Sequence, residues 1–261
     1  MNSSICALCI QPRDLCKSHI IPNAVFRRIK QRQNSGQLIH LDDFDHTPVQ
    51  YSQESWWEYL LCADCERTIE KYERYGLALL RGRDRTKTQK NSEGIILKEH
   101  DYALFKLFLT SVIWRAAVSK QPHFSKVVLL DESREKARVS LFNGKPLHPL
   151  HLGCKLLRLI DDTREANGGF STENLEQLII SPIFRLQEGR PYYTLLFLFE
   201  GFLLEYFVRA IPYKRATEKG VHRDLPILFV PNKSIFRIPE LVKLMVSAYD
   251  KHDRGMVTLK S

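Results

Sequence analysis

Four cysteines stand in two pairs that share one spacing. The stretch "CALC" holds Cys6 and Cys9, and "LCADCE" holds Cys62 and Cys65. A turn of this kind presents two thiolates from one short loop, and two such turns supply the four ligands that Zn²⁺ takes in a tetrahedral site. The sequence therefore predicts one structural zinc site, because two matched pairs are better explained by a metal than by buried cysteines acting as small apolar residues.

A histidine lies between the two pairs, in the stretch "DLCKSHIIPNAVFRR" at residues 14–28. His19 is followed by two β-branched residues, which are stiff, and then by proline. A neutral imidazole with a pKa near 7 can accept a proton from water at cellular pH. The residues around His19 do not by themselves fix its role. Two alternatives stay open: a histidine that simply packs in a core, and a zinc site in which Cys16 or His19 replaces one of the four cysteines.

The elements that must position these groups lie in the first 80 or so residues. This part contains five of the six cysteines and two of the three tryptophans, and it has few long apolar runs. After the second pair, Ile69, Tyr72, Tyr75 and Leu79 recur at three- and four-residue steps, which predicts an amphipathic helix. The carboxylates of "LDDFDH" at 41–46 fall in a polar stretch that we expect to be an exposed loop.

The rest of the chain predicts a second, larger α+β domain over residues 101–261, joined by a basic linker at 86–100. Residues 102–120 are apolar almost all round and predict a buried helix. The run "PLHLGCKLLRLIDD" predicts another helix, and residues 178–211 predict an antiparallel meander of three strands. The predicted class is thus α+β, with the small module at residues 1–85. A further strand at "PILFV" and a helix at "IPELVKLMVSAYDKH" complete the prediction.

Charge and hydropathy narrow the function classes. Basic residues number 39 against 30 acidic ones, which gives a net charge of +9. Such a surplus favours a polyanionic partner, nucleic acid above all, although it also serves simple solubility. The most apolar stretch, 194–208, carries Glu200 and Glu205 and is too short and too charged to span a bilayer. With no signal peptide visible, we expect a cytoplasmic protein that has no membrane partner and keeps its thiols reduced.

The ordered motifs "CALC", "SHIIP" and "LLCADCE", the last leading into a helix, resemble the HNH endonuclease superfamily in its zinc-stabilised, treble-clef (ββα) form. The resemblance covers about a third of the chain. It implies hydrolysis of DNA phosphodiester bonds, with RNA not excluded. It also implies His19 as the general base, a catalytic Mg²⁺ or Mn²⁺ ion and structural Zn²⁺. The residues it implies for phosphate contacts are Arg27, Arg28, Lys30 and Arg32.

The second region is similar to that of uncharacterised bacterial proteins that carry such a module before a mostly helical domain, some of them near phage-defence genes. This likeness implies little about chemistry, but the neighbouring defence genes lead us to expect an anti-phage effector with a defence-system partner. The HNH resemblance adds a homodimer as an alternative, because HNH nickases often pair to cut both strands. The chain departs from the family at three points. Ser18 replaces a carboxylate, an expected asparagine is missing, and Glu66 replaces the usual histidine or asparagine, where it would bind the catalytic metal. These departures motivate the alternative, a catalytically inactive zinc-structured module that binds nucleic acid or protein.

Overall fold

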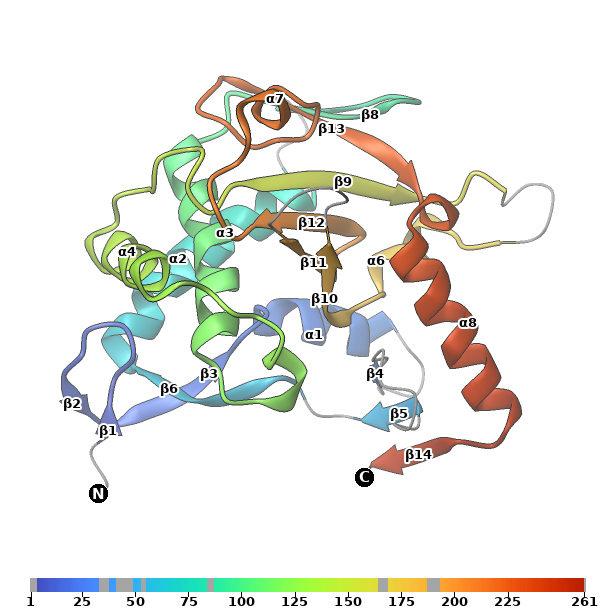
Figure 1. The fold of residues 1–261 in the computed structure, drawn as a ribbon, viewed down its shortest axis with the longest axis horizontal. Helices are drawn as coiled ribbons and strands as arrows, with labels where there is room; N and C mark the ends of the chain where they lie inside the picture. Colours follow the sequence, from blue (N-terminus) through green and yellow to red (C-terminus); the bar gives the residue numbers. More distant parts are fainter. Residues whose placement is uncertain are drawn as a thin grey trace.

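The chain folds into an α+β structure around one large mixed sheet (Figure 1). The computed structural model describes residues 4–32, 38–40, 49–52, 55–83, 87–163, 169–186 and 193–260 of the 261. The predicted acidic loop at 41–46 lies outside these residues. None of the helices in the described ranges combines the length and apolarity that a bilayer crossing needs.

The large sheet has seven strands in the order β10-β11-β12-β9-β13-β8-β7. The meander predicted from the sequence is confirmed, because neighbouring strands of β10–β11–β12 pair antiparallel. Only β13 and β9 pair in parallel within the described sheet. The strands are β7 (Thr88–Lys90), β8 (Gly94–Lys98), β9 (Cys154–Ile160), β10 (Ile180–Leu186), β11 (Tyr193–Phe199), β12 (Phe202–Phe207) and β13 (Ile227–Ser234).

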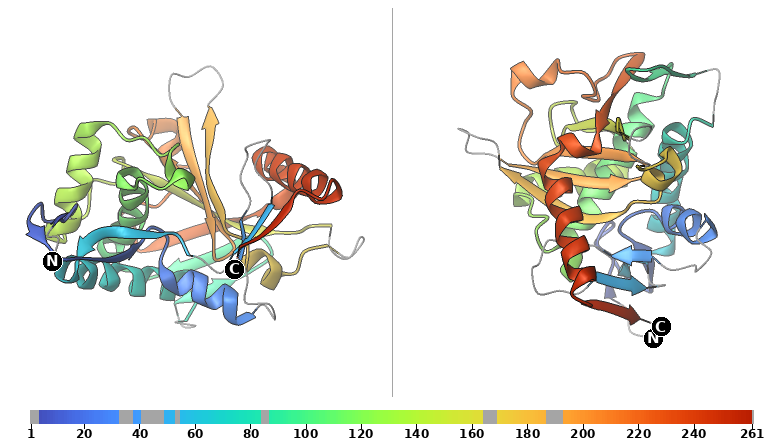
Figure 2. Two further views of the ribbon diagram at one scale, coloured as in Figure 1. Left: turned by 90° about the horizontal axis from the view of Figure 1, so that it is seen from below. Right: turned by 90° about the vertical axis from the view of Figure 1, so that its right-hand side faces the viewer.

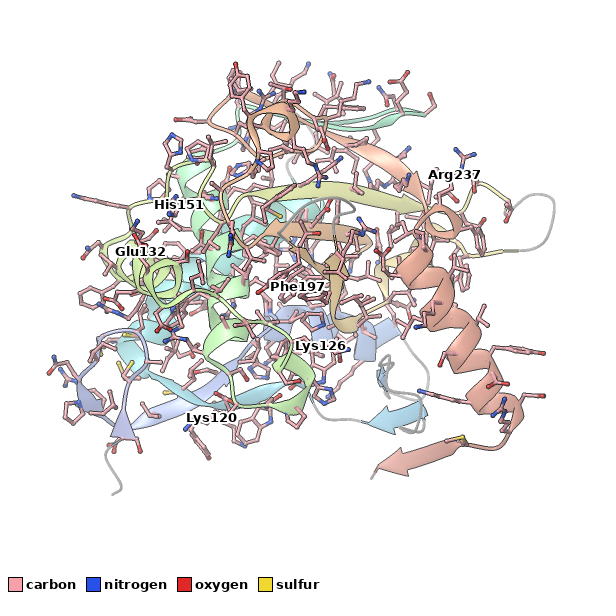
Figure 3. All side chains as sticks on the ribbon, viewed as in Figure 1. Lys120, Lys126, Glu132, His151, Phe197 and Arg237 are labelled. Carbon is pink, nitrogen blue, oxygen red and sulfur yellow. The ribbon has the colours of Figure 1, made fainter. Side chains whose placement is uncertain are left out.

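Both faces of the sheet are covered. On β11, Leu195 and Phe197 pack in the apolar cluster that contains α3 (Tyr102–Val118). The alternate residues Leu196 and Leu198 pack with residues of α8 (Pro239–Asp253) instead. Burial on both faces is the reason that these strands read as continuous apolar runs rather than as an alternating pattern. Phe197 accordingly lies in the interior, whereas Glu132 and Arg237 lie at the periphery (Figure 3).

The run at 149–162 forms strand β9 and not the predicted helix. β9 lies between β12 and β13, so it is a central strand. Cys154, Leu156 and Leu159 are buried, and the intervening residues are partly covered. A short apolar run that is buried on both faces fits helical spacing as well as strand spacing, and the tertiary context decides between them.

Most of the predicted linker at 86–100 is part of the sheet. β8 pairs with β13, and β7 pairs with β8 as the edge strand. The side chain of Asn91 closes the β7–β8 turn by accepting from the backbone N–H groups of Glu93 and Gly94 at 2.9 Å. Ile95 and Leu97 are buried. These residues therefore join the two predicted regions as strands rather than as a free connection.

The N-terminal region is built on the antiparallel pair β3 (Leu15–His19) and β6 (Trp57–Cys62), followed at once by α2 (Ala63–Leu80). A two-stranded ribbon, β1 (Ser4–Ile5) and β2 (Pro12–Arg13), precedes it, and α1 (Asn23–Arg32) follows β3. Trp56 is buried, whereas Trp57 is half-buried. Figures 1 and 2 place the last strand, β14 (Val257–Lys260), beside β5 (Val49–Ser52), with which it pairs in parallel; β4 (Leu38–His40) is the third strand of that sheet.

Helices α2 and α3 join the N-terminal region to the large sheet. Their sequence predictions are confirmed: α2 is amphipathic, and α3 is buried over most of its circumference. The ring of Phe108 lies against Gly76, where a Cβ atom would come within 2.2 Å of it. One apolar cluster therefore extends from Cys6 to Val230. The remaining helices are η1 (Pro122–Phe124), α4 (Asp131–Asn143), α6 (Thr172–Glu176), α7 (Tyr213–Ala216) and η2 (Ile235–Arg237).

Candidate metal centre and adjacent cavity

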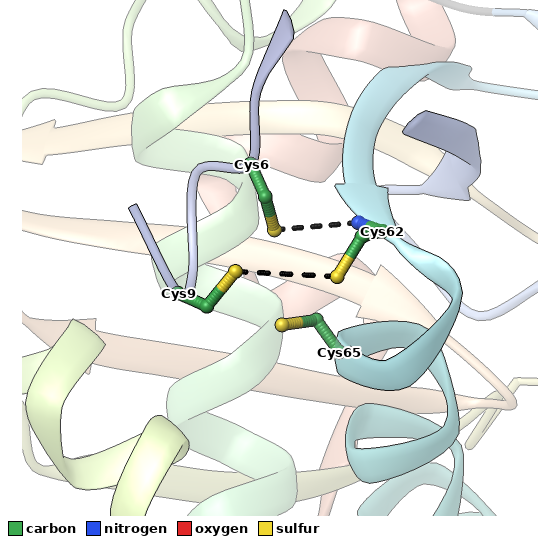
Figure 4. Close-up of side chains that lie close together, drawn as sticks. All are labelled: Cys6, Cys9, Cys62 and Cys65. Atoms are coloured by element: carbon green, nitrogen blue, oxygen red, sulfur yellow. Dashed lines mark hydrogen bonds between the residues drawn. The ribbon is translucent and has the colours of Figure 1, made fainter. Parts of the chain in front are cut away.

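The four predicted zinc ligands converge (Figure 4). The Sγ atoms of Cys6, Cys9, Cys62 and Cys65 all lie within 4.8 Å of one another, and none of these cysteines is in a disulfide. Tetrahedral Zn–S bonds of about 2.3 Å require sulfur atoms about 3.8 Å apart. The Sγ atoms of Cys9 and Cys62 are 4.0 Å apart. The cluster is therefore of the right size to hold an ion such as Zn²⁺, and neither Cys16 nor His19 belongs to it.

Local backbone geometry builds the cluster. The turn after Cys6 is closed by the Ile10 N–H, which donates to the carbonyl of Cys6 at 2.9 Å. The Cys62 N–H donates to Sγ of Cys6 at 3.3 Å. Burial raises the pKa of the Cys6 thiol, but backbone N–H groups offset this and hold the pKa below its usual value. Burial and the neighbouring sulfurs raise the pKa of Cys65 instead. Because four crowded thiolates repel one another, a bound cation would stabilise the set.

His19 ends β3 at the end of the β3–β6 ladder opposite the cysteines: Leu15 pairs with Cys62, and His19 with Trp57. Its Nε2 lies 2.9 Å from the hydroxyl of Ser55. Burial, followed by the charges of Arg115 and Arg27, lowers the pKa of His19 to about 4. The imidazole is therefore neutral at pH 7 and has the protonation state of a base.

Glu66 lies in the first turn of α2, directly after Cys65. Its Oε1 atom is buried and has no hydrogen-bond partner. The pKa of Glu66 is raised above its usual value, because burial raises it more than the Ser18 hydroxyl and Arg115 lower it. Ser18 is fully buried and its Oγ accepts from the N–H of Leu61 at 3.0 Å, so it serves the β3–β6 pair. An unpartnered carboxylate oxygen is a donor that suits a hard divalent cation.

His19 and Glu66 line the same cavity, which has a volume of about 460 Å³. Its charged lining consists of Glu66, Glu70 and Glu73 together with Arg27, Arg67, Arg74, Arg81, Arg83 and Arg115. Arg27, Arg74 and Arg83 are exposed and form no ion pair with any residue in the described ranges. Cations at the mouth favour an anionic ligand, and the carboxylates offer ligands for a metal ion beside it.

The carboxylates of the cavity do not form a ready-made metal cage. Among the described residues, the four cysteines are the one group of three or more metal-ligating side chains that converge. Glu73 is in an ion pair with Arg115, with Nη2 and Oε1 2.6 Å apart. Mg²⁺ commonly takes only one or two protein carboxylates, and substrate phosphate and water supply the other ligands. Glu66 and Glu70 are the other two carboxylates that line the cavity.

The four basic residues predicted to contact phosphates have different surroundings. Arg27 is exposed and lines the cavity. Lys30 is half-buried and has an interaction partner. Arg32 is in an ion pair with Glu176 at 2.9 Å. Of the four, Arg27 alone lines the cavity that contains His19.

Arg28 belongs to an ion-pair network around the buried Glu200 instead. It contacts both Glu176 and Glu200, and Glu200 also pairs with Arg81, Oε1 to Nη2, at 2.5 Å. The Glu200 side chain is 1% exposed. It occupies the two-residue β11–β12 turn with Gly201, where both residues have positive φ. The network therefore anchors α1 and the end of α2 to the large sheet.

Three residues of this region escaped prediction: Ser55, Glu200 and Arg115. Arg115 is 1% exposed, and its Nη1 donates to the carbonyl of His19 at 2.5 Å. The sequence did carry a signal for Arg115, because a lone arginine in the apolar stretch "SVIWRAAV" must have a buried partner. Nothing near Ser55 or Glu200 in the sequence indicated their partners.

No family model, curated protein or solved structure matches this chain. The arrangement of the cysteine cluster and the cavity is therefore the basis for a functional inference.

Proposed function

We propose that the protein is a metal-dependent nuclease that hydrolyses DNA phosphodiester bonds in the cavity beside the cysteine cluster. The observation that carries the proposal is that His19 and Glu66, one at a strand end and one at a helix start, line one cavity together with the exposed arginines Arg27, Arg74 and Arg83. A base, a metal-binding carboxylate and phosphate-binding cations are the groups that this reaction needs.

The local topology supports the same proposal. The antiparallel strands β3 and β6 are followed directly by α2. Cys62 and Cys65 of the predicted zinc site lie at the start of that helix, and Cys6 and Cys9 lie in the turn between β1 and β2. This is the order of elements that the resemblance to the zinc-stabilised HNH superfamily implies. We propose that residues 1–85 form a treble-clef module of that kind, with Zn²⁺ as its structural ion.

His19 would take a proton from the water molecule that attacks phosphorus. A new bond forms between that water oxygen and phosphorus as the bond from phosphorus to the leaving oxygen breaks. With a pKa of about 4, the free imidazole is a weak base. A phosphate in the cavity would oppose the charges of Arg115 and Arg27 and so raise the pKa of His19 towards neutrality.

The chain's other residues would bind and orient the substrate. Arg27, Arg74 and Arg83 would bind backbone phosphates through charge-assisted hydrogen bonds. Glu66 and Glu70 would hold Mg²⁺ or Mn²⁺, which when bound would stabilise the negative charge that develops on the phosphate. Ser55, which is hydrogen-bonded to Nε2 of His19, would keep the imidazole oriented towards the cavity.

The second candidate is a zinc-structured module that binds nucleic acid without cleaving it. Ser18 favours it: at the position where the resemblance places a carboxylate, Ser18 is buried in the β3–β6 pair. Binding by the exposed arginines would then be the whole function. Partners in a defence system, or a second copy of this chain, remain part of the proposal implied by the resemblance.

The test compares purified wild type with His19→Gln and, as a control, His252→Gln on the exposed surface of α8. Plasmid, short duplex, single-stranded DNA and RNA are incubated with Mg²⁺ or Mn²⁺, and zinc content is measured in parallel. We expect His19→Gln to retain zinc and to lose cleavage by about 10²-fold or more, since general-base catalysis contributes about 10²–10⁴-fold. If no substrate is cleaved with either metal, but DNA binding is equal in all three proteins, the binding module is the correct function.

A further inference from the structure

The buried helix α3 carries one arginine, Arg115, whose guanidinium contacts His19 and Glu73, two residues that line the cavity. Arg115 donates from Nε to the carbonyl of Ser111, one turn earlier, at 3.2 Å. Its Nη1 donates to the carbonyl of His19 at 2.5 Å, and its Nη2 lies 2.6 Å from Oε1 of Glu73. One guanidinium therefore connects α3, the end of β3 and the middle of α2.

The burial of this arginine needs a reason. A guanidinium that is 1% exposed loses its hydration, and removing water from a charge costs several kcal/mol in general. Most of the other side chains of α3 are apolar and buried. An apolar residue at position 115 would therefore suit the packing there. What an apolar residue cannot supply is a rigid fork that holds two polar partners at fixed separation.

We propose that Arg115 is a positioning residue of the nuclease site: it fixes the backbone of His19 and the carboxylate of Glu73 from the opposite part of the chain. This inference rests on the proposed function. It implies that residues 1–85 do not form a complete site by themselves, because α3 supplies a group that the site needs. Arg115 acts through His19 and Glu73 and does not contact the reacting phosphate.

The electrostatic surroundings of His19 are consistent with this role. The cations that lower the pKa of His19 are Lys17 on its own strand, Arg27 and Lys30 on α1, and Arg115 on α3. The groups of α2 that share the cavity are Glu66, Glu70, Glu73, Arg67 and Arg74. Arg115 has the largest effect among the four cations, so its removal should raise the pKa of His19.

The test uses Arg115→Met and Arg115→Lys in the full chain. The control is Arg185→Met: Arg185 also pairs with glutamates, Glu240 and Glu205, but it is less deeply buried than Arg115 and lies on β10. Cleavage of plasmid gives kcat and KM, and NMR titration of the histidine side chains in the zinc-loaded protein gives the pKa of His19. Zinc content and melting temperature report whether each variant is folded.

For Arg115→Lys we expect kcat to fall about tenfold or more with KM within twofold, because one ammonium cannot hold both partners in the geometry of a fork. The pKa of His19 should stay low, since the charge is retained. For Arg115→Met we expect a larger loss of kcat and a higher pKa of His19. Arg185→Met should lower the melting temperature but leave kcat and the pKa of His19 unchanged.

Full turnover in Arg115→Lys overturns the inference, as does an equal loss of kcat in Arg185→Met. If Arg115→Met does not fold, Arg115→Lys decides the question. A wild-type protein that cleaves nothing overturns the proposed function and the positioning role of Arg115 with it. The NMR titration separates the two failures, because an unchanged His19 pKa in Arg115→Met shows that the contact itself is absent, whether or not the protein cleaves DNA.

Discussion

The cysteine cluster and the cavity lie beside each other around the start of α2, but different parts of the chain hold them together. The cluster uses the turn after Cys6 and the start of α2. The cavity takes His19 from β3, Arg27 from α1 and Arg115 from α3. Arg81, which lines it, is held by Glu200 in the β11–β12 turn. The cluster is thus a local structure, whereas the cavity depends on the packing of the whole molecule.

This difference gives the two sites different sensitivities. Loss of the metal should disorder the turns and, because Glu66 follows Cys65 directly, should also disturb the cavity. Loosening of the contacts between the helices and the sheet should change the cavity and leave metal binding intact. Variants at four positions along the chain test this one-way dependence.

The largest effect is expected from removal of the metal. Cys62→Ser leaves three ligands, and structural zinc contributes about 10–16 kcal/mol in isolated zinc-finger peptides. We expect Cys62→Ser to lose stoichiometric zinc, measured by mass spectrometry, and to unfold at a much lower temperature. It should also lose any cleavage activity.

The control for this variant is Cys16→Ser. Cys16 is a free, half-buried thiol in β3 that lies outside the cluster. It should keep one zinc per chain and a melting temperature near that of wild type. Equal zinc loss in both variants would contradict the four-cysteine site.

The next effect is expected at Glu200. Glu200→Gln removes the negative charge between Arg28 and Arg81, and breaking a buried ion pair costs about 3–5 kcal/mol. Urea unfolding should show this loss, while zinc content stays at one per chain. Glu132→Gln is the control: its partner Lys136 lies one turn away on the exposed surface of α4, and we expect no measurable change. Loss of zinc in Glu200→Gln would show that the two sites depend on each other.

A smaller effect is expected where α2 meets α3. A Cβ atom at Gly76 would lie 2.2 Å from the ring of Phe108, so Gly76→Ala must move the two helices apart. Overpacking of this kind costs about 1–3 kcal/mol. We expect a lower free energy of unfolding, reduced cleavage and unchanged zinc content. An unaltered or higher stability would contradict the close approach of the helices.

The last effect is the contribution of His19 to the pH dependence of stability, which is confined to acidic pH. Its pKa is lowered from 6.5 to about 4 in the folded chain, so the unfolded chain binds the extra proton between these values. Stability should therefore fall as the pH is lowered from about 6.5 to about 4, with no contribution from His19 above that window. In urea titrations at matched zinc content, the free energy of unfolding of His19→Gln should fall less steeply than that of wild type as the pH is lowered. Identical pH profiles for the two proteins would contradict the burial of the imidazole.

The cysteine cluster was predictable, because the spacing of two CxxC pairs is enough to identify its four members, Cys6, Cys9, Cys62 and Cys65. Helices α2 and α3 and the meander were also predictable from periodicity and length. The partners in the cavity were not. Arg115 lies 96 residues from His19, and Glu200 lies 119 residues from Arg81. Only the assembled fold brings such residues together, and nothing in their neighbouring sequence marks the pairing.

The error at β9 has a related cause. The apolar residues of β9 fit both helical spacing and strand spacing over seven positions. The strands on either side of it, β12 and β13, come later in the chain. The same holds for the predicted linker, whose polar hairpin becomes ordered only because β13 pairs with β8. Local propensity is a weak guide where the deciding contacts are made by distant segments.

The continuous apolar cluster from Cys6 to Val230 limits which segment of the chain can be transferred into another protein. A recombination event that transferred residues 1–85 alone would leave the inner surface of α2 without α3 and His19 without its buried arginine. A functional graft would have to carry α3 and the β7–β8 hairpin along with the cysteines. Shuffling in nature, and chimeras built in the laboratory, should therefore respect a junction well beyond the second cysteine pair.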